Sequence, residues 1–130
     1  MTFEEKAFES FESGEKLLSE EKYNSCVNRV YYGMFQIILH KIDNMNKLQE
    51  VNDEARKSKK GTHNFTIEWY INNYLNNRVK LKDKILARNS AHSLRDLRHK
   101  ADYTKDGITE KLAKHALMHG KNFNEIIKNK

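Results

Sequence analysis

An all-α fold, arranged as an up-and-down bundle of about five helices, is predicted by three features of the sequence. Proline is absent from the 130 residues and there are only five glycines, so the chain lacks the turn residues that an all-β fold requires. Apolar residues recur every three or four positions over long stretches. The aromatic content of 10% is too high for a disordered chain, and the length suits a single domain over residues 1–130.

The first two helices are predicted by their apolar stripes. A helix over about residues 3–20 follows Thr2, and Thr2 and Glu5 have the spacing of a capping box. A second helix, over about 22–43, has the longest stripe and should be the most buried element. Its apolar residues are Tyr23, Cys26, Val27, Val30, Tyr31, Met34, Ile37, Ile38 and Ile42.

The rest of the chain divides into a loop and three more helices. Residues 44–61 are polar and end in Lys-Ser-Lys-Lys-Gly, which predicts a loop. A third helix is expected over about 63–77 with Thr62 as its N-cap, and a fourth over about 79–102. The fifth, over about 108–128, has Asp106 or Thr109 as its cap.

Composition excludes several classes of protein. Cys26 is the single cysteine, which rules out a disulfide framework and a multi-cysteine zinc site. No apolar run approaches the roughly 18 residues of a membrane span. The N-terminal segment is acidic and has no apolar signal core, so we expect a cytoplasmic protein that does not enter a membrane.

Charge is distributed unevenly along the chain. The net charge is +6, but residues 1–22 hold three lysines and seven glutamates, a net of −4. Residues 78–105 hold nine lysines and arginines and three aspartates, a net of +6. A basic stripe of this kind suits RNA or another polyanion, and it also suits the acidic face of a protein partner. A solvated helix face is the plainer alternative.

The fourth helix carries the strongest candidates for catalytic or phosphate-binding residues. At 100° per residue, Arg88, His92, Arg95, His99 and Asp102 share an arc of about 80°. Arginine stays cationic and holds phosphate oxygens in a fork, whereas histidine titrates near neutrality and moves protons. Together these groups suit attack of a 2′-hydroxyl on its neighbouring phosphate, which needs neither a metal nor a cofactor. Spacing alone slightly favours the alternative that they only solvate the outer face.

Four other positions are weaker candidates. His63 lies at a predicted helix start, where it either binds phosphate or has a capping or packing role. Arg29 interrupts the apolar second helix and needs a partner, for which Asp102 or Asp96 is available. His115 and His119 have the i, i+4 spacing of a zinc pair but no third ligand nearby in the sequence, so no metal site is expected.

Three segments resemble a known family, the HEPN domains. Residues 23–35, with Arg29-Val30-Tyr31-Tyr32 at their centre, are similar to that family's R-x-Y-Y segment. Thr62-His63 resembles the Ser/Thr-His pair that opens the third helix of one branch. Arg98-His99-Lys100-Ala101-Asp102-Tyr103 resembles the R-x-x-A-D-Y signature. The three matches occur in order and span about residues 23–103.

The resemblance implies a compact helical bundle that forms a homodimer. Many HEPN proteins are metal-independent RNases of toxin–antitoxin, CRISPR or phage-defence systems, and they often act beside a small nucleotidyltransferase antitoxin. Their RNase motif is an arginine followed, after four to six residues, by a histidine. Here Arg88 to His92 and Arg95 to His99 have gaps of three residues, and Arg98 is followed by Asp102.

Two functional hypotheses follow, and a third is plainer. In the first, the protein is an RNase toxin, in which Arg95 or Arg98 holds the phosphate, His99 or His92 transfers protons, and Arg88 belongs to the same catalytic set. In the second, it is a non-catalytic module for RNA, a nucleotide or a nucleotidyltransferase partner. In that module a second set of residues forms either a binding site or a buried polar network. The set consists of Arg29, His63, Arg98, Asp102 and Tyr103. The third is a structural subunit whose basic helix meets an acidic partner.

Overall fold

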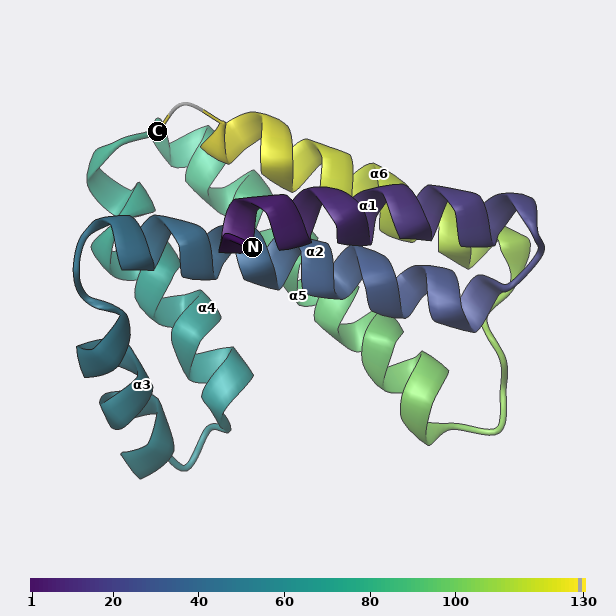
Figure 1. The fold of residues 1–130 in the computed structure, drawn as a ribbon, viewed down its shortest axis with the longest axis horizontal. Coiled ribbons are helices and arrows are strands. Elements are labelled where there is room, and N and C mark those ends of the chain that lie inside the picture. The colour runs from purple at the N-terminus through teal and green to yellow at the C-terminus, as the bar shows by residue number, and fades with distance from the viewer. Residues whose placement is uncertain (129) are drawn as a thin grey trace.

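The computed structural model describes residues 1–128 and 130 and contains, within them, six α-helices, one short 3₁₀ helix and no strand (Figure 1). The elements are α1 (Phe3–Ser19), α2 (Tyr23–Asn44), α3 (Leu48–Lys57), α4 (Thr62–Asn73), η1 (Leu75–Asn77), α5 (Leu81–Tyr103) and α6 (Glu110–Ile127). The predicted all-α bundle is therefore confirmed.

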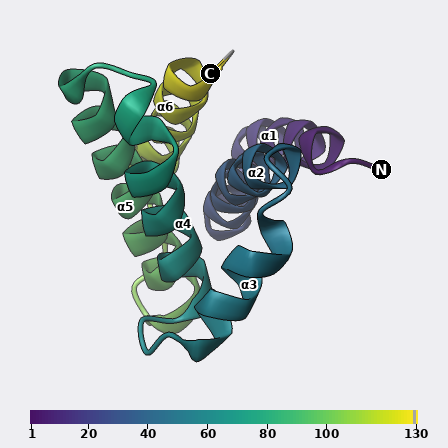
Figure 2. The same ribbon diagram turned by 90° about the vertical axis from the view of Figure 1, so that its left-hand side faces the viewer.

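Helix α2 is the central element of the bundle. It contacts each of the other five α-helices, and Figure 2 shows α1 and α3 on its side of the molecule, with α4, α5 and α6 opposite. Ten of its residues are buried, which confirms that the longest apolar stripe marks the most buried helix. The largest fully buried side chains include Tyr31, Met34 and Ile38 from α2, Tyr70 from α4 and Phe123 from α6.

The predicted loop over residues 44–61 is wrong, because α3 occupies ten of these residues. Val51 and Ala55 lie one turn apart on α3 and are buried, whereas most of its other residues are exposed. Two apolar positions make a stripe too narrow to distinguish a short surface helix from a polar loop. The additional helix also makes the expected count of five too low.

Helix ends agree with the sequence in part. Thr2 accepts a hydrogen bond from the Glu5 backbone N–H at 3.1 Å, and Thr109, rather than Asp106, caps α6. Thr62 is not the cap of α4 but its first residue. Gly61 occupies the cap position with φ of 87°, a left-handed conformation that favours glycine. The third predicted helix, expected to reach residue 77, ends as an α-helix at Asn73, and the 3₁₀ helix η1 follows it over Leu75–Asn77.

Glycine at position 120 allows α6 to lie close to α2. A Cβ atom built on Gly120 would approach Val30 Cγ1 to 2.7 Å and Phe11 Cε1 to 3.2 Å. Val30 is fully buried and β-branched, so its side chain has little freedom to move away. The absence of a side chain at Gly120 is thus a packing requirement.

We expect Gly120→Ala to lower the free energy of unfolding by about 1–2 kcal/mol. Overpacking costs about 1–3 kcal/mol, and the helix propensity of alanine offsets up to about 1 kcal/mol of it. Urea denaturation followed by circular dichroism measures the change. Gly107→Ala is the control, because its Cβ would come no closer than 3.9 Å to Asn24 Oδ1. An unchanged or raised stability for Gly120→Ala would contradict the packing argument.

Among the described residues, none of the helices combines the length and apolar character needed to cross a bilayer.

Candidate functional site

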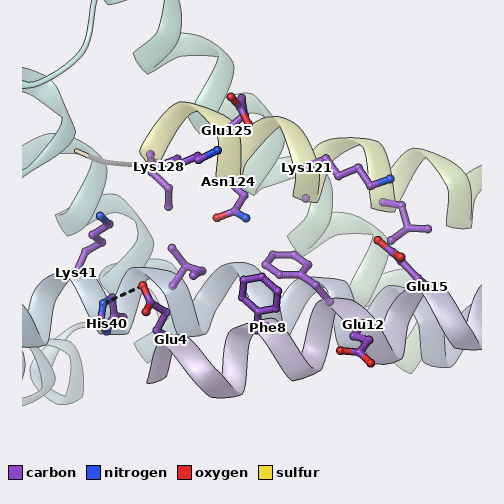
Figure 3. Close-up of a pocket in the computed structure, with 15 residues that line it drawn as sticks. Glu4, Phe8, Glu12, Glu15, His40, Lys41, Lys121, Asn124, Glu125 and Lys128 are labelled. Carbon is purple, nitrogen blue, oxygen red and sulfur yellow. Dashed lines mark ion pairs between the residues drawn. The ribbon is translucent and has the colours of Figure 1, made fainter. Parts of the chain in front are cut away.

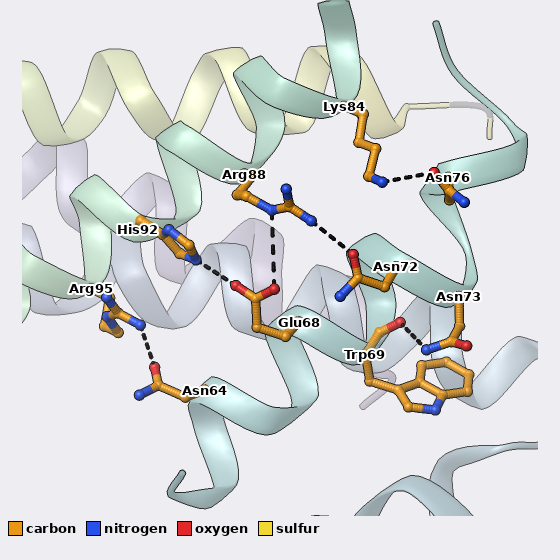
Figure 4. A network of polar contacts seen from close by, with 10 residues as sticks. All are labelled: Asn64, Glu68, Trp69, Asn72, Asn73, Asn76, Lys84, Arg88, His92 and Arg95. Carbon is orange, nitrogen blue, oxygen red and sulfur yellow. Dashed lines mark hydrogen bonds and ion pairs between the residues drawn. The ribbon is translucent and has the colours of Figure 1, made fainter. Parts of the chain in front are cut away.

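The predicted residues of α5 separate into two groups along the helix. Toward the N-terminal half, Arg88 and His92 contact α4 and form part of a polar ladder between the two helices (Figure 4). Toward the C-terminal end, Arg95, Arg98 and His99 line an open groove. The shared arc expected from the sequence therefore spans two different environments.

In the polar ladder, side chains of α5 pair with side chains of the preceding segment. Its residues are Lys84, Arg88 and His92 on α5, Glu68 and Asn72 on α4, and Asn76 on η1. Arg88 Nη2 donates to Asn72 Oδ1 at 2.7 Å, and the Arg88 Nε lies 4.0 Å from Glu68 Oε2. His92 Nε2 lies 2.6 Å from Glu68 Oε1. Farther along, Lys84 Nζ donates to Asn76 Oδ1 at 2.7 Å. Because one carboxylate, Glu68, contacts both Arg88 and His92, these two side chains join α5 to α4 and do more than solvate an outer face.

The second group lines what we call the α4–α5 groove, about 370 Å³ in volume. It lies where the segment leading into α4 meets the C-terminal half of α5 and the middle of α2. Its lining residues are Tyr31, Lys60, Gly61, Thr62, His63, Asn64, Arg95, Arg98, His99 and Tyr103. Five of them were candidates from the sequence, and the fold brings them together from two helices, α4 and α5: His63, Arg95, Arg98, His99 and Tyr103.

Two guanidinium groups in the groove are held in place by neighbours. Arg95 Nη1 donates to Asn64 Oδ1 at 2.8 Å, and its Nη2 lies 3.5 Å from the Asp96 carboxylate. Arg98 Nη2 donates to Tyr32 Oη at 3.3 Å, and its Nε lies 3.4 Å from Asp102 Oδ2. A guanidinium has five N–H donors, so each retains donors for a further acceptor.

The guanidinium of Arg98 packs against two aromatic rings of α2. Its guanidinium carbon lies 5.0 Å from the ring centre of Tyr31 and 5.4 Å from that of Tyr32, within the range of cation–π attraction. The Arg98 side chain is only 22% exposed. A cation that is packed on two rings and paired with one carboxylate has lost most of its side-chain freedom, so it presents a fixed charge to the groove.

Two imidazoles also line the groove, in different surroundings. His63 Nδ1 lies 3.0 Å from Tyr31 Oη, and its ring stacks on Phe35 at 4.2 Å between centroids. Burial, and to a lesser degree the Arg98 charge, lower the pKa of His63, so it is neutral at pH 7. Burial also raises the pKa of Tyr31 to about 12, which keeps its hydroxyl protonated. His99 is exposed, with its ring 5.0 Å from that of Tyr103.

The expected pairing of Arg29 is wrong. Arg29 is exposed, and Asp102 instead accepts a hydrogen bond from Asn28 Nδ2 at 2.9 Å while it pairs with Arg98. The neighbouring Asn28 thus occupies the position expected for Arg29, because one residue corresponds to a rotation of about 100° around α2. Asp96, the other expected partner, lies beside Arg95.

Cys26 and His119 lie outside the groove. Cys26 is buried, and burial raises its pKa to about 11, so it is not a thiolate at neutral pH. His119 on α6 has an Nδ1 atom that is buried without a hydrogen-bond partner in the described part of the chain. Across the described residues, no cluster of three or more histidine, cysteine, aspartate or glutamate side chains is arranged to hold a metal ion.

Several residues of the site were missed in the sequence. Lys60 and Asn64 line the groove, and Glu68 and Asn72 form the ladder. Asn64, Glu68 and Asn72 recur every four residues, which is a polar stripe on one face of α4. Arg88 and His92 on α5 have the same four-residue spacing as Glu68 and Asn72, so a comparison of the two helices could have predicted the ladder.

The lowered pKa of His63 predicts a loss of stability in mild acid. Since its folded-state pKa lies below the unfolded value of about 6.5, stability is full above that pH and falls as pH decreases through the folded-state pKa. His119, whose pKa burial and His115 also lower, acts in the same direction. We therefore expect His63→Gln to lose less stability between about pH 7.5 and 5.5 than the wild type.

Urea denaturation at the two pH values tests this expectation. The exposed residue His99 supplies the control variant, His99→Gln, which should leave the effect of His63 in place. If His63→Gln shows the same acid-induced loss as the wild type, burial of a neutral imidazole at His63 is not a source of the pH dependence.

The sequence matches no family model, and no significant similarity to a curated protein or to a solved structure was found.

Proposed function

We propose that the α4–α5 groove binds the phosphate backbone of single-stranded RNA, and that the protein is a HEPN-like module of a toxin–antitoxin or phage-defence system. The observation that carries the proposal is the convergence of two pre-positioned guanidiniums, Arg95 and Arg98, on one groove. Their remaining N–H donors suit phosphate oxygens, which arginine binds in a fork geometry.

Other features of the groove support a nucleic-acid ligand. Lys60 and His99 lie on the same lining, and the N-terminus of the 12-residue α4 adds the positive end of its dipole. Tyr103, at 68% exposure, offers a ring on which an unpaired base can stack. Stacking requires a splayed base, which favours a single strand over a duplex. The choice of RNA over DNA follows the family resemblance.

Salt dependence of binding tests the proposal. Fluorescence anisotropy with a labelled single-stranded RNA of about 12 nucleotides gives the affinity at several salt concentrations. Three phosphate contacts, through Arg95, Arg98 and Lys60, should give a log–log slope of about −2, since each contributes roughly −0.7 on a single strand. Absence of binding, as expected for a purely structural subunit, or a slope near zero would contradict the proposal.

Metal-independent RNA cleavage is a second candidate, favoured by the presence of His63 and His99 on the same lining as the guanidiniums. In this reaction neutral His63 removes the proton of a ribose 2′-hydroxyl, and the 2′-oxygen forms a bond to the adjacent phosphorus. His99 gives a proton to the 5′-oxygen as the P–O5′ bond breaks. Arg95 and Arg98 stabilise the charge on the phosphate oxygens in the transition state. His92 is less suited, because Glu68 engages it.

Incubation of RNA with the protein in EDTA tests the cleavage candidate. The expected products carry 2′,3′-cyclic phosphate and 5′-hydroxyl ends, and a 2′-deoxy substitution at the cleavage position should prevent their formation. His63→Ala and His99→Ala should each lower the rate by about 10²–10⁴-fold. Intact RNA at high protein concentration, or full activity of both variants, would exclude this role and leave the binding proposal in place.

The partner expected from the resemblance is a nucleotidyltransferase antitoxin. A gene for such an enzyme next to the gene for this protein would support a toxin–antitoxin pair.

A further inference from the structure

A second groove lies between α1 and α6, over α2, and is larger than the first, at about 620 Å³ (Figure 3). Helices α1 and α6 both rest on α2 but contact each other little, so the space between them is open to solvent. Apolar side chains from all three helices line it, and they include Phe11, Ile37 and Leu117. None of the residues in this α1–α6 groove belongs to the α4–α5 groove, so the RNA site proposed above does not use this surface.

The two walls of the α1–α6 groove have opposite charges. The charged residues are Glu4, Glu12 and Glu15 on the α1 wall, and Lys121 and Lys128 on the α6 wall. Glu125 is an acidic exception on the α6 wall. Glu4 lies 3.5 Å from His40 of α2, whereas the other four residues have no ion-pair partner within the described part of the chain. These four charges are therefore available to an occupant of the groove.

The groove has the length and shape of an absent helix. Its α1 wall extends from Glu4 to Glu15, and its α6 wall from Leu117 to Lys128. At the rise of an α-helix, each wall is about 16 Å long, or roughly three turns. With α2 as the floor and two helices as walls, a further helix along the open side would complete a four-helix bundle. Because the described residues contain no strand, an extended peptide would find no sheet edge to join.

An exposed aromatic side chain stands at the edge of this groove. Phe8 is 72% exposed, whereas Phe11, about one turn farther along α1, is partly buried against the core. A large exposed apolar group beside an apolar depression is typical of an interaction surface. Phe8 thus extends the apolar lining of the groove onto its α1 wall.

A second copy of this chain offers no helix of the kind that fits. The occupant needs an exposed apolar stripe roughly three turns long to cover the groove. Among the described residues, the largest group of neighbouring exposed apolar side chains is Leu81, Ile85 and Leu86 of α5, which covers less than two turns. The apolar stripes of the other long helices are buried in the core of the bundle. A different protein is therefore the better match.

We propose that the α1–α6 groove binds an amphipathic helix of a different protein, one whose apolar face lies between a basic flank and an acidic flank. The apolar face packs on Phe11, Ile37 and Leu117, while the basic flank lies along α1 and the acidic flank along α6. In this mode of recognition the apolar face provides affinity, and the charged flanks exclude helices with the wrong pattern. The proposal does not depend on RNA binding, because the two grooves share no residue.

A synthetic helical peptide of about 18 residues is the probe, since shorter helices are marginal in water. This mixed peptide carries leucine on one face, lysine on one flank and glutamate on the other. Fluorescence anisotropy with the full chain should give a dissociation constant of about 100 μM or tighter. Peptides with lysine on both flanks or glutamate on both flanks should bind at least about fivefold more weakly, because one flank then faces a wall of like charge.

The three peptides distinguish recognition by the two walls from attraction by net charge. Turning the mixed peptide end to end exchanges its flanks, so one of its two directions matches both walls. Net charge alone would rank the glutamate peptide first, since the protein carries a charge of +6. That ranking, equal affinities of the three peptides, or an absence of binding would overturn the proposal.

Reversing the charge of one wall should change which peptide binds best. Lys121→Glu with Lys128→Glu makes both walls acidic, so this variant should bind the lysine peptide at least about fivefold more tightly than the mixed peptide. The control, Lys82→Glu with Lys111→Glu, alters the net charge equally at exposed residues outside the groove and should keep the wild-type preference. Circular dichroism verifies that both variants are folded. The same preference in both variants would contradict recognition by the walls.

A substitution at Phe8 tests the position of the site and identifies its occupant. Phe8→Ser should weaken binding of the mixed peptide by at least about tenfold, whereas Leu81→Ser, at an equally exposed residue (70%) of α5, should leave it unchanged. Sedimentation equilibrium of the wild type and both variants detects self-association through the groove. A wild-type dimer that only Phe8→Ser dissociates would show that a second copy covers the groove, and the proposal would then be wrong.

Discussion

Replacing Arg95 with glutamine should weaken binding of single-stranded RNA by about 10- to 100-fold, whereas Arg88→Gln should change it by less than about threefold. Arg95 lies on the α4–α5 groove with donors to spare, so its loss removes a charge-assisted hydrogen bond to phosphate. Arg88 donates to Asn72 and faces Glu68 in the ladder. Its removal therefore affects the contact between α4 and α5 rather than the ligand.

The two variants are closely matched. Both residues lie on α5, are equally exposed (33% and 35% of their side chains) and lose one positive charge on substitution. A purely non-specific effect of net charge would weaken RNA binding equally in both. Anisotropy titrations at the same salt concentration measure the difference, and circular dichroism verifies the fold. Equal losses would show that the basic face as a whole, and not the groove, attracts the RNA.

Replacing Phe123 with alanine should lower the free energy of unfolding by about 3–5 kcal/mol. Phe123 lies on α6 and is completely buried in the cluster that joins all six helices. The substitution removes its ring and leaves a cavity that the close approach of α6 to α2 at Gly120 prevents from collapsing. Because domains of this size have about 5–15 kcal/mol of stability, the loss is a large share of the total.

Urea denaturation measures this loss, with Leu81→Ala as the control. Leu81 begins α5 and is 70% exposed, so truncation there should change the stability by no more than about 0.5 kcal/mol. A loss of less than about 1 kcal/mol for Phe123→Ala would indicate that the core is loosely packed around α6.

The fold followed from the sequence wherever an apolar stripe was long. Helix α2 was evident because buried positions recur from Cys26 to Ile42 along its 22 residues. Helix α3 was not, because its ten residues bury only Val51 and Ala55. The cap of α4 was misplaced by one residue, since Thr62 has the composition of a cap but Gly61 has the backbone conformation. Residue preferences indicate that a helix begins near Thr62, but the backbone conformation determines which residue is the cap.

The sequence singled out five residues that line the α4–α5 groove, but it did not predict that the candidates on α5 divide into two groups. A helical projection gives the angle of Arg88, His92, Arg95 and His99 around α5, and it places them on one face. It does not show what covers that face along the helix axis. Helix α4 begins at Thr62, so its polar stripe reaches Arg95 through Asn64 and leaves His99 beyond its end exposed. The boundary between the ladder and the groove along α5 depends on how α4 packs against α5. The apolar and polar pattern of α5 alone does not contain that information.

We propose that RNA binds at the α4–α5 groove and not along the ladder. The most direct measurement is a ¹H–¹⁵N correlation spectrum of the labelled protein during titration with single-stranded RNA. The predicted result is a set of shifts concentrated in residues 60–64 and 95–103. Shifts concentrated at Glu68, Asn72 and Arg88, or no shifts at all, would contradict binding at the groove.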